Sequence, residues 1–70
     1  MFEFCISERD RIGELRTRLR VRSANLKLLK RLGELVAVRR GSPEACWTWG
    51  PKRDWLHLAV DDDCFLTIRP

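Results

Sequence analysis

The 70-residue sequence predicts an α+β fold in which a helical hairpin packs on one face of a small antiparallel sheet. Three observations support this prediction. Residues 2–6 alternate in polarity, residues 8–40 carry apolar side chains at helical spacing, and residues 45–69 contain β-rich runs separated by turn residues. The predicted order of elements is β-α-α-β-β-β. A chain of this length forms one domain, 1–70.

The first strand is predicted over residues 2–6, where apolar side chains occupy every second position: Phe2, Phe4 and Ile6. A helix is expected to follow, because Ser7 is a good N-cap and acidic residues stand in the first turn. Three apolar residues then share one stripe at helical spacing: Ile12, Leu15 and Leu19. The predicted first helix therefore has a narrow apolar seam and a cationic exterior.

The second predicted helix begins after Ser23, a candidate N-cap, and is the main donor of core side chains. Its apolar arc consists of Ala24, Leu28, Leu29, Leu32, Leu35 and Val36. It should end before Gly41 and Pro43, which are typical of a helix C-terminus. Gly33 inside this helix suggests close packing of a neighbour. Because about three residues separate the two helices, residues 8–40 should form a basic helical hairpin.

Residues 45–69 predict a β-meander with strands over 45–49, 55–60 and 64–69. The run Asp61, Asp62 and Asp63 is interpreted as a turn rather than as a metal site. Alternation assigns one set of side chains to the helix-facing side of the sheet: Phe2, Phe4, Ile6, Leu56, Leu58, Val60, Cys64, Leu66 and Ile68. The opposite side should carry Trp55, His57, Phe65, Thr67 and Arg69, an unusually aromatic face to leave open.

Basic residues are concentrated in the predicted hairpin. Residues 8–40 hold eleven of the fourteen lysines and arginines and only four acidic residues. The predicted binding surface for nucleic acid or another partner consists of Arg16, Arg18, Arg20, Arg22, Lys27, Lys30, Arg31, Arg39 and Arg40. Such an array can neutralise phosphates and release counterions, although a solvated surface would have the same composition.

All three tryptophans, Trp47, Trp49 and Trp55, lie in the predicted meander. In so small a domain at least one indole should be partly exposed. An exposed indole can stack on a base or anchor a protein interface, including one between two copies of this chain. Burial in the core is the alternative interpretation, and the sequence leaves these uses open.

No catalytic, metal-binding or cofactor-binding motif stands out. The three cysteines, Cys5, Cys46 and Cys64, form no CxxC pair, and His57 is the single histidine. The chain also lacks an apolar run long enough to cross a membrane. We therefore expect a cytoplasmic protein without a cofactor or a membrane partner, and a binding protein rather than an enzyme.

The predicted element order, a helical hairpin followed by a three-stranded meander, is similar to that of the RelE/ParE group of small toxins. That resemblance implies cleavage of messenger RNA on the ribosome, with basic and aromatic side chains near one end of the sheet. The corresponding candidates are Lys52, Arg53, His57 and Arg69. Two departures stand against this function, since the chain contains no tyrosine and stops at Pro70, where many members continue.

The leading prediction is a small basic module that binds nucleic acid, RNA or DNA, or a nucleoprotein. The first alternative is an inhibitor or adaptor, of the kind that phages and mobile elements encode, that binds an acidic surface on a host protein with the same charges. The second alternative is the ribosome-dependent endoribonuclease that the resemblance implies.

Overall fold

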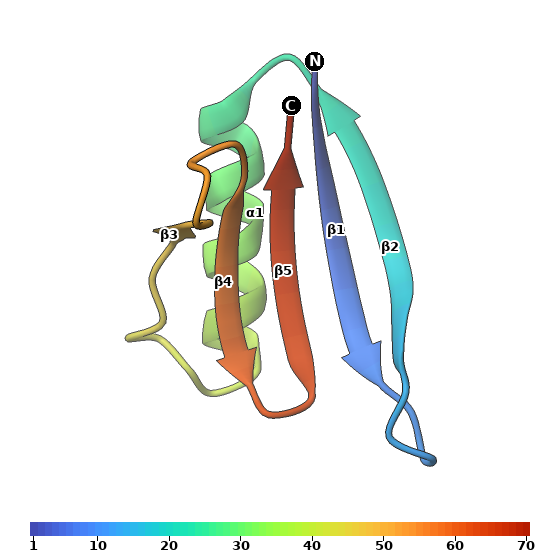
Figure 1. The fold of residues 1–70 in the computed structure, drawn as a ribbon. Helices are drawn as coiled ribbons and strands as arrows, with labels where there is room; N and C mark the ends of the chain where they lie inside the picture. The colour runs from blue at the N-terminus through green and yellow to red at the C-terminus, as the bar shows by residue number, and fades with distance from the viewer.

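One helix covers one face of a five-stranded antiparallel sheet in the computed structural model, which describes residues 1–70. The elements are β1 (Phe2–Arg9), β2 (Leu15–Ser23), α1 (Leu26–Arg39), β3 (Thr48–Trp49), β4 (Leu56–Asp61) and β5 (Cys64–Arg69) (Figure 1). The strand order across the sheet is β2-β1-β5-β4-β3. The predicted α+β class is confirmed. The element order is β-β-α-β-β-β, so the predicted helical hairpin is wrong.

The first predicted helix is a β-strand, β2. Its residues alternate strictly between arginine and another side chain, as in Leu19, Arg20, Val21 and Arg22, which is the two-residue period of a strand. The apolar residues assigned to a helical seam are exposed instead, with Ile12 75% and Leu15 50% exposed. The helical spacing of Ile12, Leu15 and Leu19 was therefore the weaker signal, and the alternation with arginine along Leu15–Ser23 was the better indicator of the structure.

A tight turn joins β1 to β2. The carboxylate of Asp10 accepts hydrogen bonds from the backbone N–H groups of Ile12 and Glu14, both at 3.0 Å. Gly13 adopts a φ of +87°, which glycine reaches without steric cost. Ser7, the predicted N-cap, lies within β1 and is paired with Thr17 of β2. Asp10 therefore initiates a turn rather than the first turn of a helix.

The second predicted helix is confirmed as α1, which begins two residues later than the Ser23 cap would place it. The side chain of Asn25 accepts a hydrogen bond from the backbone N–H of Leu28 at 3.1 Å and caps the N-terminus. At the other end Gly41 has a φ of +83°, and the N–H of Ser42 donates to the carbonyl of Ala37 at 2.8 Å. This left-handed glycine ends the helix, as predicted.

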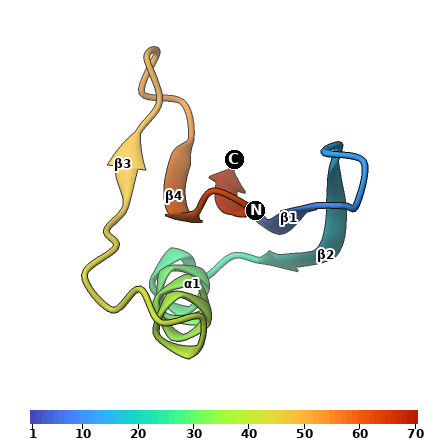
Figure 2. The same cartoon turned by 90° about the horizontal axis from the view of Figure 1, so that it is seen from below.

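The core lies between α1 and the sheet (Figure 2). Its buried cluster consists of Phe4, Leu29, Ala37, Leu56, Leu58, Val60, Cys64, Leu66 and Ile68, with Phe2 and Ile6 packed against it. The predicted helix-facing set is therefore confirmed. Because α1 is the only helix, the face of the sheet turned away from this core has no helix on it.

Gly33 faces Trp47 across the edge of the core. A Cβ atom at Gly33 would collide with the benzene ring of that indole, and the indole Nε1–H donates to the carbonyl of Lys30 at 3.2 Å. The close packing predicted from Gly33 is thus confirmed. It also explains why the segment before β3 leaves the sheet, since Trp47 packs on α1 instead of continuing a strand.

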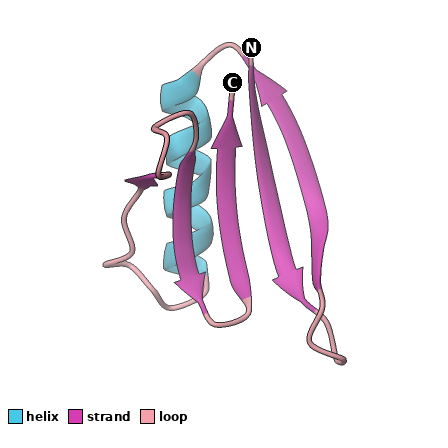
Figure 3. Cartoon of the chain, viewed as in Figure 1, coloured by secondary structure: helices cyan, strands magenta, loops and turns pink.

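The meander is confirmed in outline, with a shorter first strand than predicted (Figure 3). Thr48 pairs with His57 and Trp49 with Leu56, and β3 contains no further residues. Between β4 and β5 the carboxylate of Asp61 accepts a hydrogen bond from the N–H of Asp63 at 2.8 Å. The aspartate run therefore forms the predicted turn.

Candidate functional site

The open face of the sheet, opposite α1, collects side chains from four strands. Strand pairing places them in two rows across the sheet. One row consists of His57, Thr67, Cys5 and Arg20, and the other consists of Ala59, Phe65, Ser7 and Thr17. The set expected on the side away from the helix is therefore found there. We call this surface, together with Trp55, Arg69, Glu3 and Arg22, the open face.

An aromatic cluster occupies the β4 side of the open face. The rings of Trp55, which immediately precedes β4, and His57 of β4 stack with their centroids 4.1 Å apart and an interplanar angle of 29°. Arg69 of β5 lies over the indole, with its Cζ atom 5.6 Å from the ring centroid. This arrangement gives a flat, partly exposed surface of π-systems beside a guanidinium group.

Phe65 adds a second aromatic position on β5. Its neighbours across the strands are Ala59 on β4 and Ser7 on β1, both small. The side chain of Phe65 is only partly buried, although a valine or leucine on either neighbour would cover it more fully. The ring of Phe65 is therefore a partly exposed aromatic group with small residues on either side.

Arginines line the β2 side of the open face. Arg20 and Arg22 both reach the carboxylate of Glu3 on β1, at 3.6 Å and 3.4 Å. Exposed ion pairs of this kind contribute little to stability. One carboxylate shared by two guanidinium groups leaves the edge cationic, so an incoming anion meets uncompensated positive charge.

The nine basic residues predicted as one binding surface lie on two elements. The four on β2 are Arg16, Arg18, Arg20 and Arg22. The four on α1 are Lys27, Lys30, Arg31 and Arg39, and Arg40 follows this helix. Arg16 is held by Asp10 at 2.7 Å in the hairpin turn, and Arg18 has no partner on β1 because the register shifts there. Of these nine residues, Arg20 and Arg22 lie on the open face, where β1 and β5 separate them from the aromatic cluster.

The three tryptophans do not form one cluster. Trp47 packs on α1, whereas Trp49 and Trp55 both line a cavity of about 290 Å³ that Phe2 and Leu26 also line. Trp49 is 57% exposed. Trp55 is the one tryptophan on the open face. Trp47 lies outside β3, so it does not share a strand face with Trp49, as the predicted strand over 45–49 would require.

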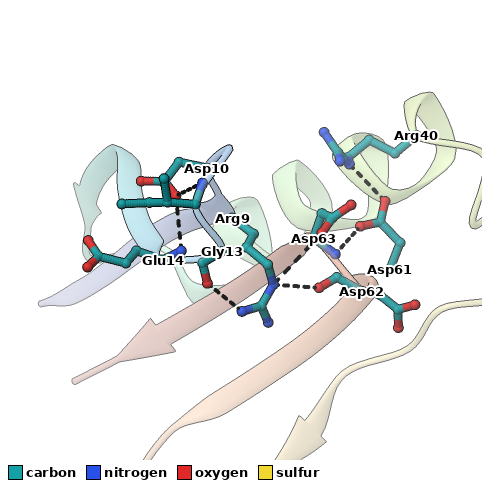
Figure 4. A network of polar contacts seen from close by, with 9 residues as sticks. Arg9, Asp10, Gly13, Glu14, Arg40, Asp61, Asp62 and Asp63 are labelled. Atoms are coloured by element: carbon teal, nitrogen blue, oxygen red, sulfur yellow. Dashed lines mark hydrogen bonds and ion pairs between the residues drawn. The ribbon is translucent and has the colours of Figure 1, made fainter.

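A polar network ties the two hairpin ends together at the far end of the sheet (Figure 4). The N–H of Arg9 donates to the carbonyl of Asp63 at 2.8 Å, and its guanidinium donates to the carbonyl of Gly13 at 2.8 Å. Arg40 bridges Glu8 at 3.5 Å and Asp61 at 3.1 Å. Arg9 and Arg40 therefore help to hold the turns together.

Hydrogen bonds in this network lower the pKa of two carboxyl groups, those of Asp61 and Asp10. The backbone N–H of Asp63 and the guanidinium of Arg40 lower the pKa of Asp61. At the β1–β2 turn, Arg16 and then the backbone N–H groups of Glu14 and Ile12 lower the pKa of Asp10. Both groups favour their charged forms in the folded protein, so they stabilise turns.

Nothing in the structure assembles a metal centre, since no three His, Cys, Asp or Glu side chains lie together as ligands. The three cysteines are free thiols. Burial raises the pKa of the Cys64 thiol, and burial followed by the neighbouring Glu3 carboxylate raises that of Cys5. α1 is too short and too polar to cross a membrane.

No protein-family model, curated protein or solved structure matches this chain. The element order on which the RelE/ParE resemblance depended is not the order in the structure, because only one helix is present. Of the four residues that the resemblance suggested, His57 and Arg69 both contact Trp55 on the open face. Lys52 and Arg53 lie in the loop that precedes β4.

Phe65 and Glu3 were not among the predicted site residues. The alternation Cys64 to Arg69 already placed Phe65 on the open side of the sheet, but a single phenylalanine in a strand is usually a core residue. Glu3 gains its role only through pairing of β1 with β2. Predicting a strand over residues 15–23 would have indicated the role of Glu3, because that strand carries Arg20 and Arg22.

Proposed function

We propose that this protein binds single-stranded nucleic acid, RNA or DNA, across the open face of its sheet. The proposal rests on the arrangement of side chains across this face. The Trp55–His57 stack and Phe65 lie on one side of it, and Arg20 and Arg22 lie on the other. Proteins that bind single strands combine stacking platforms with a cationic track for phosphates. Sheets with exposed aromatics are one of the known solutions.

The spacing of the two parts suits a strand of nucleotides. Neighbouring strands are about 4.8 Å apart, so β4 and β2 are about 14 Å apart across β5 and β1. An unpaired base can stack on Phe65 or on the ring of His57, while its phosphates reach Arg20 and Arg22. Each such stack contributes about 1 to 3 kcal/mol. Arg69 supplies a further cation between the two parts.

A duplex is the poorer ligand for this surface. The bases of a duplex are already stacked on one another, so they cannot reach aromatic side chains on a flat sheet. The cations of α1 would contact phosphates of either form without that distinction. We therefore expect a preference for single strands if the open face binds, and no such preference if α1 binds.

The proposal is tested with charge reversals on the two elements. Arg20→Glu with Arg22→Glu should lower the affinity for a fluorescent single-stranded oligonucleotide by at least about tenfold at low salt. The matched control, Lys27→Glu with Arg31→Glu, makes the same change in net charge on exposed positions of α1. Binding should survive in the control. The opposite result would move the site to α1.

A second pair of variants tests stacking without changing charge. Phe65→Leu keeps an apolar side chain on the open face but removes the π-system, and should weaken binding by about tenfold. Trp47→Leu removes an indole that packs on α1, away from the open face, and should leave affinity unaltered. Far-UV circular dichroism and the urea midpoint of each variant separate loss of binding from loss of fold.

One observation favours RNA cleavage as a second candidate function. His57 and Arg69 both contact Trp55, so a proton acceptor and a cation lie close together on the surface proposed to hold RNA. A single-turnover assay with purified RNA distinguishes the two functions. Cleavage by the native protein that is lost in both His57→Ala and Arg69→Ala would indicate a nuclease; intact RNA at saturating protein would leave binding alone.

A further inference from the structure

The two edges of the sheet differ. The edge formed by β3 is two residues long, and beyond it only the four residues 58–61 of β4 have no strand partner on that side. The edge formed by β2 is nine residues long, and every residue from Leu15 to Arg20 is exposed. An edge strand presents a row of backbone N–H and C=O groups on its outer side. β2 is therefore the longest edge at which another strand can be added to this sheet.

The regular part of β2, Leu19–Ser23, has two chemically different sides. Leu19 and Val21 face the side of the sheet that carries α1, where they pair with Ile6 and Phe4. Arg20 and Arg22 project on the open face. Leu19 remains 47% exposed because no further strand covers it. An added strand would extend the apolar side over Leu19 and meet the arginines on its other side.

The β2 strand of a second copy of this chain would fit poorly against the free edge of β2. Antiparallel pairing that keeps the α1 sides of both copies together sets odd-numbered residues opposite odd-numbered ones. Arg20 and Arg22 of one copy would then lie opposite arginines of the other. Like charges directly opposite one another on a sheet are destabilising. A shift by one residue removes this repulsion but turns the apolar side of one copy toward the other's arginines.

We propose that β2 accepts an extended segment of a partner protein as a sixth strand, in which acidic side chains alternate with apolar ones. The acidic side chains would pair with Arg20 and Arg22, and the apolar ones would cover Leu19 and Val21. Main-chain hydrogen bonds supply affinity in this mode of recognition, and alternate side chains supply specificity. The inference stands independently of nucleic-acid binding, because it depends on the free edge and on the apolar side of β2.

The proposal makes the two ligands competitors. Arg20 and Arg22 serve both surfaces, so an acidic strand on β2 would displace phosphates from the same guanidinium groups. Leu19, by contrast, lies on the α1 side and should matter only for the added strand. This difference separates failure of one proposal from failure of the other.

The test uses three synthetic peptides of the length of β2. In the first, glutamate alternates with valine; in the second, the same residues are arranged as a block of each; in the third, lysine replaces glutamate. The alternating acidic peptide should bind at least about tenfold more tightly than the other two, measured by fluorescence anisotropy. Equal binding of the alternating and block peptides would overturn the proposal, because charge alone would then explain it.

A protein variant tests the apolar contact with the added strand. Leu19→Gln removes apolar area without changing charge, and should weaken binding of the alternating peptide by about tenfold while leaving binding of single-stranded nucleic acid unchanged. Hydrogen exchange gives an independent readout. Bound peptide should slow exchange of backbone amides in β2 and leave those in β3 unaltered. Absence of this protection at saturating peptide would also overturn the proposal.

Discussion

The guanidinium of Arg69 lies over the indole ring of Trp55, with Cζ 5.6 Å from the ring centroid. The other stacking partner of Trp55 is His57, which precedes a buried leucine on β4. Residues of two neighbouring strands thus bring a cation and a second ring into contact with one indole on the open face. This contact connects the aromatic part of the open face to its cationic part.

Replacing Arg69 should change how salt affects nucleic-acid binding. Arg69→Gln removes one phosphate contact, so the log-log slope of affinity against salt for a single strand should become less negative by about 0.7. A salt titration of the native and variant proteins measures this slope. Arg31→Gln on α1 is the control and should keep the native slope. Equal slopes in all three proteins would place Arg69 outside the contact.

Gly33→Ala should destabilise the protein despite the better helix propensity of alanine. The added methyl group collides with the indole of Trp47, and overpacking of this kind costs about 1 to 3 kcal/mol against a propensity gain of about 1 kcal/mol. Urea unfolding measures the difference. In a Trp47→Leu background the collision is relieved, so the same substitution should become neutral or stabilising. Equal effects in both backgrounds would contradict the packing assigned to Trp47.

The outcome of sequence prediction differed between the two halves of the chain. Leu56, Leu58 and Val60 alternate with polar or small residues in a run with no competing helical pattern, so their side of the sheet was predictable. In residues 8–22 the helical spacing of three leucine or isoleucine residues coexisted with an arginine alternation. The strand prevails because β1 offers a pairing partner, a tertiary contact that local patterns do not reveal.

The bounds of α1 could be predicted from the sequence, whereas the contacts of the candidate site could not. Its cap at Asn25 and its end at Gly41 could be located to within two residues from the sequence alone. The pairing of Arg20 and Arg22 with Glu3 could not, because it depends on the register between β1 and β2. The candidate surface therefore became visible only once strand order was known.

Stability should decrease in acid through the turn that contains Asp61. The N–H of Asp63 and the guanidinium of Arg40 hold the pKa of Asp61 below its ordinary value of 3.8, so the unfolded chain takes up the proton first as pH falls. The contribution is complete above that ordinary value and is lost as pH falls through the lower pKa of the folded state. Urea midpoints measured from about pH 6 to pH 2 should fall less steeply in Asp61→Asn.

The control for this measurement is Asp62→Asn, which removes a neighbouring carboxylate that makes no hydrogen bond or ion pair through its side chain. Its pH profile should follow that of the native protein. A native-like profile in Asp61→Asn as well would show that the turn does not couple stability to pH.

Cys46 should react first with a thiol-specific reagent at neutral pH. It is exposed, whereas Cys5 and Cys64 are buried and their thiols have a raised pKa, which lowers the thiolate fraction. Labelling followed by mass spectrometry should show one fast and two slow sites. Cys46→Ser should abolish the fast phase, and a persisting fast phase would mean that one of the buried thiols is accessible.

The indole N–H signals of the three tryptophans test the central proposal most directly. Trp55 reports the open face, Trp47 reports α1 through its bond to the carbonyl of Lys30, and Trp49 reports the cavity that it lines together with Trp55. In a two-dimensional ¹H–¹⁵N spectrum, titration with a single-stranded oligonucleotide should shift the Trp55 signal together with the Phe65 and Arg20 amides. The Trp47 signal should stay in place. Shifts of Trp47 and the α1 amides with an unchanged Trp55 would contradict the account.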